Sequence, residues 1–179
     1  MLAAAGVAFE VASPQVDEAA LKAEALLTDD LALELAKAKA LSVSDARIAD
    51  WVVGSDSVVT VQGRLFDKPA DCEQAAEHLR FFSGKTIQLT SAAVLARGNS
   101  IDWSHAQTAA LEVRPLSDQF IASYLDEEWP EVGHCVGVFR MEGRGVQLFS
   151  RIEGDYFTIL GMPLLPLLGA LRERGLLMS

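Results

Sequence analysis

The sequence predicts an α/β protein in which helices flank a mixed β-sheet. Three observations carry this prediction. Apolar runs of strand length alternate along the chain with segments whose apolar residues recur at helical spacing. Some of the strands are separated by short glycine-containing loops, which favour antiparallel neighbours within one sheet. A length of 179 residues, half of them hydrophobic, suits a single domain with a sizeable core.

The first third of the chain contains strands and one long helix. Val7–Ala12 is a short apolar run of strand type, whereas Asp30–Ala46 consists of helix formers with apolar residues on one face. Trp51–Val53 is a compact strand that ends at Gly54-Ser55-Asp56. Val58–Val61 continues as a separate strand.

A helix followed by a hairpin is expected in the middle of the chain. Asp71 and Gln74 have the spacing of a capping box, and Gly84 is a natural stop, so a helix is expected between them. Thr86–Ala96 is predicted to be a long strand. It pairs with Ala106–Val113 across a glycine-containing hairpin loop.

The last third begins and ends with a helix. Ser117 is placed to cap the first of these helices, and Pro163 is placed as the first residue of the second, which extends to about Gly175. Three short strands joined by glycine turns are expected between them: Val136–Phe139, Val146–Ile152 and Tyr156–Leu160.

Charge and hydropathy exclude several classes of function. A formal net charge of −10 disfavours a nucleic-acid groove, because phosphate backbones are held by clustered lysines and arginines. The most apolar stretch, Phe157–Leu171, is interrupted by glycines and prolines and falls short of the roughly 20 apolar residues that span a bilayer. The N-terminus has no basic signal-peptide region, and the two cysteines are far apart, which suits a reducing compartment. We therefore expect a soluble, cytoplasmic protein with no membrane partner.

The strongest local signal for chemistry is the carboxylate that follows a strand, Asp56. An apolar strand that ends in Gly54 and then an acidic residue places a carboxylate at the edge of a sheet, where ligand crevices of open α/β sheets form. From the residues alone, the alternative that Asp56 caps a turn is equally favoured.

Three further motifs are candidates for ligand binding. Pro69 restricts Lys68 to extended backbone conformations, which could direct its ammonium toward a phosphate. Asp17-Glu18 could hold Mg²⁺ together with Asp56. Glu142, in a glycine-rich loop, could contact a nucleobase edge. Each also has a plainer interpretation: a solvated lysine, an exposed acidic turn and a hairpin turn.

Taken together, these pieces resemble the Maf family of nucleoside triphosphate pyrophosphatases. The similarity lies in the joint order and spacing of motifs that are individually weak, and it covers nearly the whole chain. The matching segments are Phe9-Glu10-Val11, Val16-Asp17-Glu18, Leu35 to Ala40, Gly54 to Val59, Gly63 to Pro69, Leu79 to Thr86, Glu142-Gly143, Ile152 to Tyr156 and Gly161 to Leu164.

The resemblance implies a fold and a reaction. Residues 1–179 would form one domain with the inosine-triphosphate-pyrophosphatase-like fold, an elongated mixed sheet flanked by helices with a central cleft between two lobes. The reaction would be hydrolysis of the α–β phosphoanhydride of a nucleoside triphosphate, giving the monophosphate and pyrophosphate, with a divalent metal, Mg²⁺ or Mn²⁺. A homodimer is implied by the family alone. The family's role would be to keep modified nucleotides out of nucleic acid.

The resemblance also assigns roles to individual residues. Asp56 matches the family's catalytic acid, the proposed proton acceptor, and also contributes to the metal site. Glu18 matches a metal-site carboxylate, and Lys39 and Lys68 match phosphate-facing lysines. Attack of water on phosphorus needs an oriented nucleophile and stabilised charge on the equatorial oxygens, and these groups could supply both.

The resemblance separates two branches by substrate. In the branch that acts on dTTP and UTP the glycine-rich loop carries Gln before Gly, whereas this chain has Glu142 before Gly143, similar to the branch that acts on 7-methyl-GTP. A carboxylate at this position can accept hydrogen bonds from the donors of guanine and favours a cationic, methylated base. Ser57 departs from that branch, which usually has Gln after the catalytic Asp. We therefore expect a methylated or purine nucleotide, with dTTP or UTP as the alternative substrates.

One segment of the family pattern is not found in this sequence. Family members begin with a strand that ends in Ser-x-x-Arg, followed by a helix, and Met1 to Gly6 resembles the tail of that helix. The first strand and its phosphate-binding arginine are therefore expected to be absent, either because the start codon was assigned too late or because this is a natural short form. The second case raises the rival hypothesis of a catalytically impaired nucleotide-binding or regulatory protein.

Overall fold

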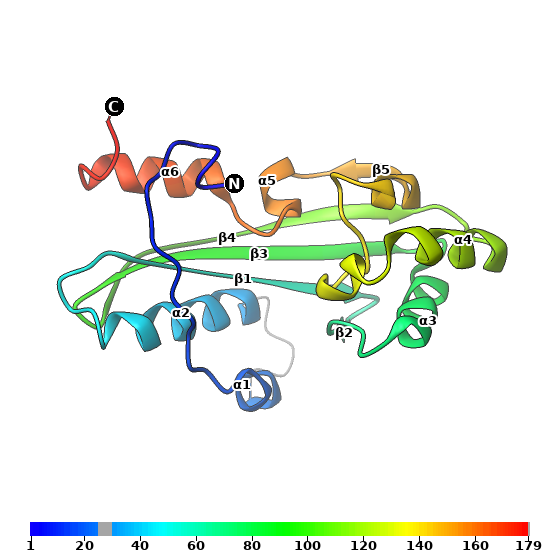
Figure 1. The fold of residues 1–179 in the computed structure, drawn as a ribbon, viewed down its shortest axis with the longest axis horizontal. Helices are drawn as coiled ribbons and strands as arrows, with labels where there is room; N and C mark the ends of the chain where they lie inside the picture. The colour runs from blue at the N-terminus through cyan, green and yellow to red at the C-terminus, as the bar shows by residue number, and fades with distance from the viewer. Residues whose placement is uncertain (25–29, 179) are drawn as a thin grey trace. The chain divides into compact units, whose positions relative to one another are not determined.

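The computed structural model describes residues 1–24 and 30–178 and contains a five-stranded sheet with helices beside it (Figure 1). The strand order is β2-β1-β3-β4-β5, and neighbouring strands are antiparallel. The strands are β1 Val52–Val61, β2 Arg64–Phe66, β3 Thr86–Arg97, β4 Ser100–Val113 and β5 Phe149–Glu153. The helices are α1 Glu18–Glu24, α2 Leu31–Ser44, α3 Cys72–Phe82, α4 Asp118–Glu128, α5 Tyr156–Ile159 and α6 Leu164–Glu173, with 3-10 turns η1 Glu131–His134 and η2 Arg144–Leu148. The predicted α/β class, with helices flanking a sheet, is confirmed.

The chain forms two compact units, and the boundary between them falls inside β1, β3 and β4. The first unit comprises Met1–Ser57, Ser91–Gln107 and Gly161–Ser179, and the second comprises Val58–Thr90 and Thr108–Leu160. The expectation of two lobes around one cleft stays a prediction. Among the helices of residues 1–24 and 30–178, none is both long and apolar enough to cross a bilayer.

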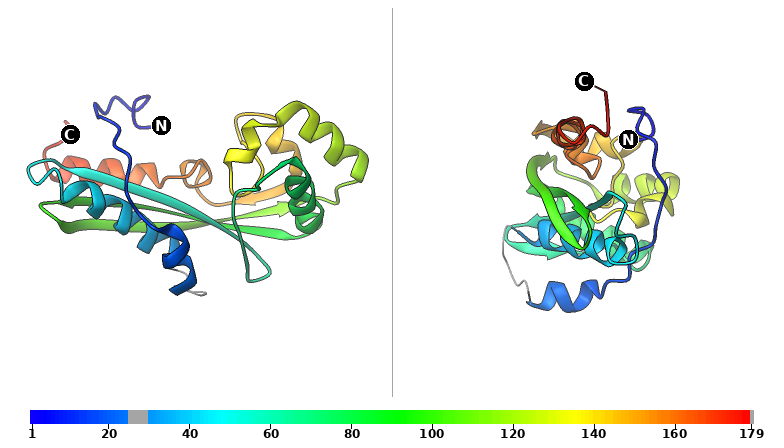
Figure 2. Two further views of the ribbon diagram at one scale, coloured as in Figure 1. Left: turned by 60° about the horizontal axis from the view of Figure 1, so that its bottom comes forward. Right: turned by 90° about the vertical axis from the view of Figure 1, so that its left-hand side faces the viewer.

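The first unit has a helix on each face of its sheet segment, α2 on one side and α6 on the other (Figure 2). Small residues allow this close layering. Ala36 and Ala40 of α2 are fully buried, as are the residues from Ala92 to Ala96 in β3. Dense packing of short side chains brings backbone close to backbone, so polar side chains attached to these elements are held within reach of one another.

The second unit has a core of large side chains between its strands and the helices α3 and α4. Phe82, Leu79, Ile121 and Leu148 are among the most buried of these residues. Burying an aromatic or leucine side chain stabilises the folded state by roughly 1.5–3 kcal/mol. These side chains therefore stabilise the second unit by burial of apolar surface.

Several local predictions are confirmed by side-chain caps. Asp71 accepts a hydrogen bond from the backbone N–H of Gln74 at 2.8 Å, and Ser117 accepts one from that of Phe120 at 3.2 Å. The hairpin between β3 and β4 turns through Gly98 and Asn99, whose φ angles are 57° and 60°. These values are typical of a tight hairpin turn between twisted strands.

The predicted strand Val7–Ala12 is wrong, because these residues have no regular secondary structure. Their apolar alternation has the period of a strand, but no strand in the described part of the chain pairs with them. Phe9 and Val11 are 52% and 86% exposed as a result. A strand needs a partner for its backbone groups, and periodicity alone does not supply one.

Three other boundaries differ from the prediction. Trp51–Val53 and Val58–Val61 were expected to be separate strands, but Gly54 to Ser57 is also extended, so β1 is continuous. Val136–Phe139 is not a strand, since Val138 has a φ of 56° that breaks the extended backbone. Tyr156–Leu160 was expected to be extended but begins the helix α5, whose first turn is capped by Asp155. At this last segment a polar cap outweighs β propensity.

Candidate functional site

Asp56 lies in the middle of β1. Successive side chains of a strand point to opposite faces, so Gly54 and Asp56 share the face toward α2, and Ser55 and Ser57 share the other. The predicted carboxylate is therefore inside a continuous strand and not in a turn.

Gly54 allows α2 to approach this strand. A Cβ atom at this position would clash with the carbonyl oxygen of Ala36 and lie 2.8 Å from the backbone nitrogen and side chain of Ala40. Only a glycine leaves room for such contact between helix and strand. The close approach explains how Lys39, beside Ala40 on the helix, reaches the strand.

Ser55 and Ser57 anchor the opposite face of β1. The Ser55 hydroxyl donates to the carbonyl oxygen of Ala92 at 2.7 Å, and the Ser57 hydroxyl pairs with that of Ser91 at the same distance. Both also contact the carbonyl oxygen of Gly161, at 3.1 and 3.2 Å. These bonds fix the backbone on either side of Asp56, so its carboxylate has a defined position.

The ammonium of Lys39 lies between two carboxylates. Its Nζ donates a short hydrogen bond to Asp56 Oδ1 and is 2.8 Å from Glu18 Oε1. The side chains of Lys39 and Asp56 are only 19% and 14% exposed, whereas that of Glu18 is 42% exposed. The structure thus brings together three of the residues singled out from the sequence, from α1, α2 and β1.

Burial and charge act in opposite directions on this cluster. Burial raises the pKa of Asp56, and the hydrogen bond and positive charge of Lys39 offset that rise only in part. Burial alone would lower the pKa of Lys39, but the hydrogen bonds and negative charges of Asp56 and Glu18 outweigh it, so the pKa is raised. A carboxylate with a raised pKa is a better proton acceptor than one in water.

The two acidic residues Asp17 and Glu18 make different contacts. Asp17 accepts a hydrogen bond from the backbone N–H of Ala20 at 3.0 Å and so caps the start of α1. Glu18, the next residue, contacts Lys39 and is also 3.8 Å from Lys22 on its own helix. Of the two, Glu18 alone contacts Lys39.

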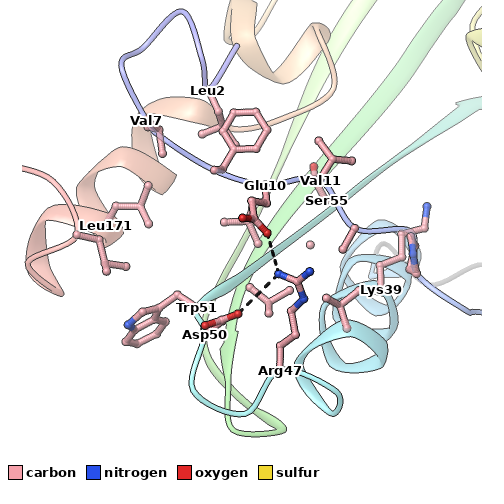
Figure 3. Close-up of a pocket in the computed structure, with 18 of the residues that line it drawn as sticks. Leu2, Val7, Glu10, Val11, Lys39, Arg47, Asp50, Trp51, Ser55 and Leu171 are labelled. Carbon is pink, nitrogen blue, oxygen red and sulfur yellow. Dashed lines mark hydrogen bonds and ion pairs between the residues drawn. The ribbon is translucent and has the colours of Figure 1, made fainter.

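A pocket of about 930 Å³ in the first unit opens beside this cluster (Figure 3). Glu18, Lys39 and Ser55 lie in its wall. Its floor holds Arg47, which binds Glu10 at 3.1 Å and lies 3.7 Å from Asp50. The remaining lining is largely apolar: Leu2, Val7, Phe9, Val11, Val43, Trp51, Val52, Val53, Met162, Leu171 and Leu176, among others. The side chain of Lys39 therefore borders an open pocket.

Lys68 and Glu142 belong to the second unit, and both are exposed. Lys68 lies in the irregular segment between β2 and α3, as its neighbour Pro69 predicts. Glu142 lies in the turn that precedes η2. Their predicted roles toward phosphate and base stay predictions.

Glu128 is a structural carboxylate that the sequence analysis missed. It is 7% exposed and accepts hydrogen bonds from Arg140 Nη2 at 3.3 Å and from the backbone N–H of Arg144 at 3.2 Å. A Cβ on Gly143 would come within 3.0 Å of it. Glu128 therefore holds both ends of the loop that carries Glu142. Its position seven residues after Ile121, on the apolar stripe of α4, was the available signal.

The predicted metal pair, Glu18 and Asp56, fits an ion that is shared with a substrate. Mg²⁺ and Mn²⁺ favour oxygen ligands, and Mg²⁺ is usually held by one or two carboxylates together with phosphates and water. The described residues contain no group of three or more His, Cys, Asp or Glu side chains that could enclose a metal by themselves. The donors thus suit a partial coordination shell and not a closed protein cage.

The fold and these residues define an α/β protein with a partly buried, mixed-charge site where a helix meets the central part of a strand. The chain belongs to the Maf-like protein family, which matches residues 1–174.

Relatives in several bacteria carry names that describe a reaction. A 7-methyl-GTP pyrophosphatase of Rhizobium meliloti (strain 1021) is 46% identical over 98% of this chain and 90% of its own length. A nucleoside triphosphate pyrophosphatase of Sphingopyxis alaskensis is 44% identical over 98% of this chain and 91% of its own length. A 7-methyl-GTP pyrophosphatase of Brucella suis is 43% identical, with 97% and 89% covered. The family resemblance found from the motifs is confirmed.

Proposed function

We propose that this chain hydrolyses the bond between the α and β phosphates of a nucleoside triphosphate and releases pyrophosphate. The observation that carries the proposal is the contact of Asp56 with Lys39 and, through it, with Glu18. The names of the relatives support the same reaction, since both kinds of name describe a pyrophosphatase.

Asp56 would accept the proton of the attacking water. Its burial and raised pKa favour this role, and general-base catalysis of this kind contributes about 10²–10⁴-fold to a rate. Lys39 would neutralise phosphate oxygens as charge develops on them. Ser55 and Ser57 hold the strand in place, so the carboxylate does not need to reorganise during the reaction.

Glu18 and Asp56 would hold a divalent cation, Mg²⁺ or Mn²⁺. When bound, such an ion supplies positive charge to the phosphate oxygens. Lys68 would contribute a further cation to the triphosphate, and Glu142 would contact the base.

7-methyl-GTP is the substrate that we favour. Two of the relatives described above carry that name, and Glu142 offers a carboxylate to a cationic guanine. Ser57 differs from the Gln that is usual in the branch that acts on 7-methyl-GTP. Its hydroxyl forms hydrogen bonds on the face of β1 opposite Asp56, so this difference does not alter the contacts of the Asp56 carboxylate. We further propose that the protein acts in the cytoplasm.

The test is product analysis on a nucleotide panel. The purified chain with Mg²⁺ should convert 7-methyl-GTP to 7-methyl-GMP and pyrophosphate faster than it converts GTP, dTTP or UTP. Faster turnover of dTTP or UTP would show that the chain has the substrate preference of the branch that acts on dTTP and UTP. Release of orthophosphate without pyrophosphate would contradict the reaction itself. Tight nucleotide binding without any product would support the rival, a catalytically impaired nucleotide-binding protein.

A further inference from the structure

The contact of Lys39 with two carboxylates has a consequence for metal binding. Its Nζ touches Asp56 Oδ1 and is 2.8 Å from Glu18 Oε1. A divalent cation held by this pair would bind the same two carboxylates. An ammonium and a metal ion held side by side by one pair of carboxylates repel each other strongly.

We propose that Lys39 is an internal counter-ion that blocks the Glu18–Asp56 pair against divalent cations until a triphosphate draws its ammonium away. The inference rests on the proposed function for the identity of the ligand. It adds an order of events. The nucleotide phosphates first replace the two carboxylates as partners of Lys39, and the carboxylates are then free to bind the metal ion. Binding of nucleotide and binding of metal are then positively coupled, and such coupling is reciprocal.

The surroundings of Lys39 allow this exchange. Lys39 is one of the residues that line the pocket, so unfilled volume adjoins its side chain (Figure 3). The backbone of α2 does not need to move, because it is fixed against β1 at Gly54. A lysine has a long flexible stem and a compact charge, which suits a group that changes partners while its helix stays in place.

Lys37 on the same helix provides a matched comparison. It pairs with Glu34 at 2.8 Å on an exposed part of α2, one turn from its own position. It therefore has the same chemistry as Lys39 and a similar position in the chain, but within the described residues its ion pair is with Glu34 and not with Asp56 or Glu18. Its substitution should leave metal binding unchanged.

A purely structural salt bridge makes a different prediction. If Lys39 only held α1, α2 and β1 together, its loss would loosen the pair of carboxylates and weaken any affinity for metal. If Lys39 is a blocking counter-ion, its loss removes the positive charge that contacts both carboxylates and leaves Lys22, 3.8 Å from Glu18, in place, so the affinity for a divalent cation rises. The two roles therefore differ in the sign of the effect.

The experiment measures Mn²⁺ binding to the full chain without nucleotide, by isothermal titration calorimetry and by the electron paramagnetic resonance signal of free Mn²⁺. Lys39→Met and Lys39→Gln should each bind Mn²⁺ at least about tenfold more tightly than wild type, within the usual range of coupling between sites. Lys37→Met should match wild type. Adding Glu18→Gln to Lys39→Met should remove the gain, because it removes one carboxylate of the pair.

Two outcomes would overturn the inference: Mn²⁺ affinity that is unchanged or weaker in both folded Lys39 variants, or a gain that survives Glu18→Gln. Circular dichroism confirms that each variant is folded, and Lys39→Gln keeps a hydrogen-bond donor should Lys39→Met fail to fold. The readout needs no turnover, so it is separable from the proposed function. A chain that releases no pyrophosphate can still show the gain in affinity, and an active one can fail to show it.

Discussion

His78 is a buried histidine whose Nδ1 has no hydrogen-bond partner within the residues that the structure describes. Its ring packs edge-on against Phe66 with centroids 5.1 Å apart. Burial lowers its pKa, the charge of Arg64 lowers it further, and the charges of Glu77 and Asp67 oppose this only in part. The neutral ring is therefore the form that the folded state favours.

This histidine should make the protein less stable in acid. The folded-state pKa of His78 lies below the unfolded value of about 6.5. The neutral ring therefore contributes fully to the free energy of unfolding above pH 6.5, and this contribution is lost as the pH falls toward the folded pKa. Urea unfolding of wild type and His78→Leu at pH 7.5 and pH 5.5 measures it. Wild type should lose up to about 1 kcal/mol more than the variant over this interval. Exposed His134→Gln is the control and should behave like wild type. An equal loss of stability in His78→Leu would contradict the conclusion that His78 causes the acid sensitivity.

The packing of α2 on β1 depends on Gly54 and sets the distance between Lys39 and Asp56. Gly54→Ala should destabilise the chain by about 1–3 kcal/mol, since the added methyl group meets the backbone of the helix. It should also lower pyrophosphate release, because α2 can accommodate the methyl group only by moving away from the strand.

Gly169 in α6 is the matched control, because a Cβ there has no neighbour within 4 Å. Gly169→Ala should stabilise the protein by roughly 0.5–1 kcal/mol through helix propensity, with activity unchanged. Thermal unfolding and product assays on both variants test the pair. Equal effects of the two substitutions on stability would show that the close approach at Gly54 is unimportant.

The loop from Phe139 to Arg144 depends on α4 through Glu128. Glu128→Gln should destabilise the chain by about 1–3 kcal/mol, because it removes the buried carboxylate that accepts hydrogen bonds from Arg140 and from the backbone of Arg144. Glu127→Gln is the control. That side chain is half exposed and pairs with Arg144 at the surface, so its loss should cost less than about 1 kcal/mol.

The two variants also separate positioning from simple stability. If the loop contacts the base, Glu128→Gln should raise KM for 7-methyl-GTP more than it lowers kcat, and Glu127→Gln should change neither. Steady-state kinetics at a temperature where both variants are fully folded make the comparison. Loss confined to kcat in Glu128→Gln would argue against a role of this loop in base binding.

Most of the fold could be predicted from the sequence where local signals agree with packing. Caps at Asp71 and Ser117 and the long apolar run of β3 were sufficient for their elements. Prediction failed where tertiary context decides. Val7–Ala12 has strand periodicity but no partner in the described structure, and Val138 adopts a left-handed backbone that its β-branched side chain would not suggest.

The residues of the candidate site could be predicted from the sequence, but the contacts between them could not. Asp56, Glu18 and Lys39 were each assigned a role by family resemblance, and the structure adds that one ammonium joins both carboxylates. The helical spacing of residues in α2 could not reveal the partners of Lys39. That contact depends on the absence of a side chain at Gly54, a feature visible only once helix and strand are packed.

The central claim for the whole molecule is that Asp56 carries out the hydrolysis of a nucleoside triphosphate. Its most direct test compares pyrophosphate release from 7-methyl-GTP by wild type, Asp56→Asn and Asp118→Asn, all verified to be folded. Asp118 is an exposed carboxylate that pairs with Arg80 and receives the same chemical change. We predict that Asp56→Asn lowers kcat by about 10²–10⁴-fold and that Asp118→Asn retains full activity. Near wild-type release by Asp56→Asn would contradict the account.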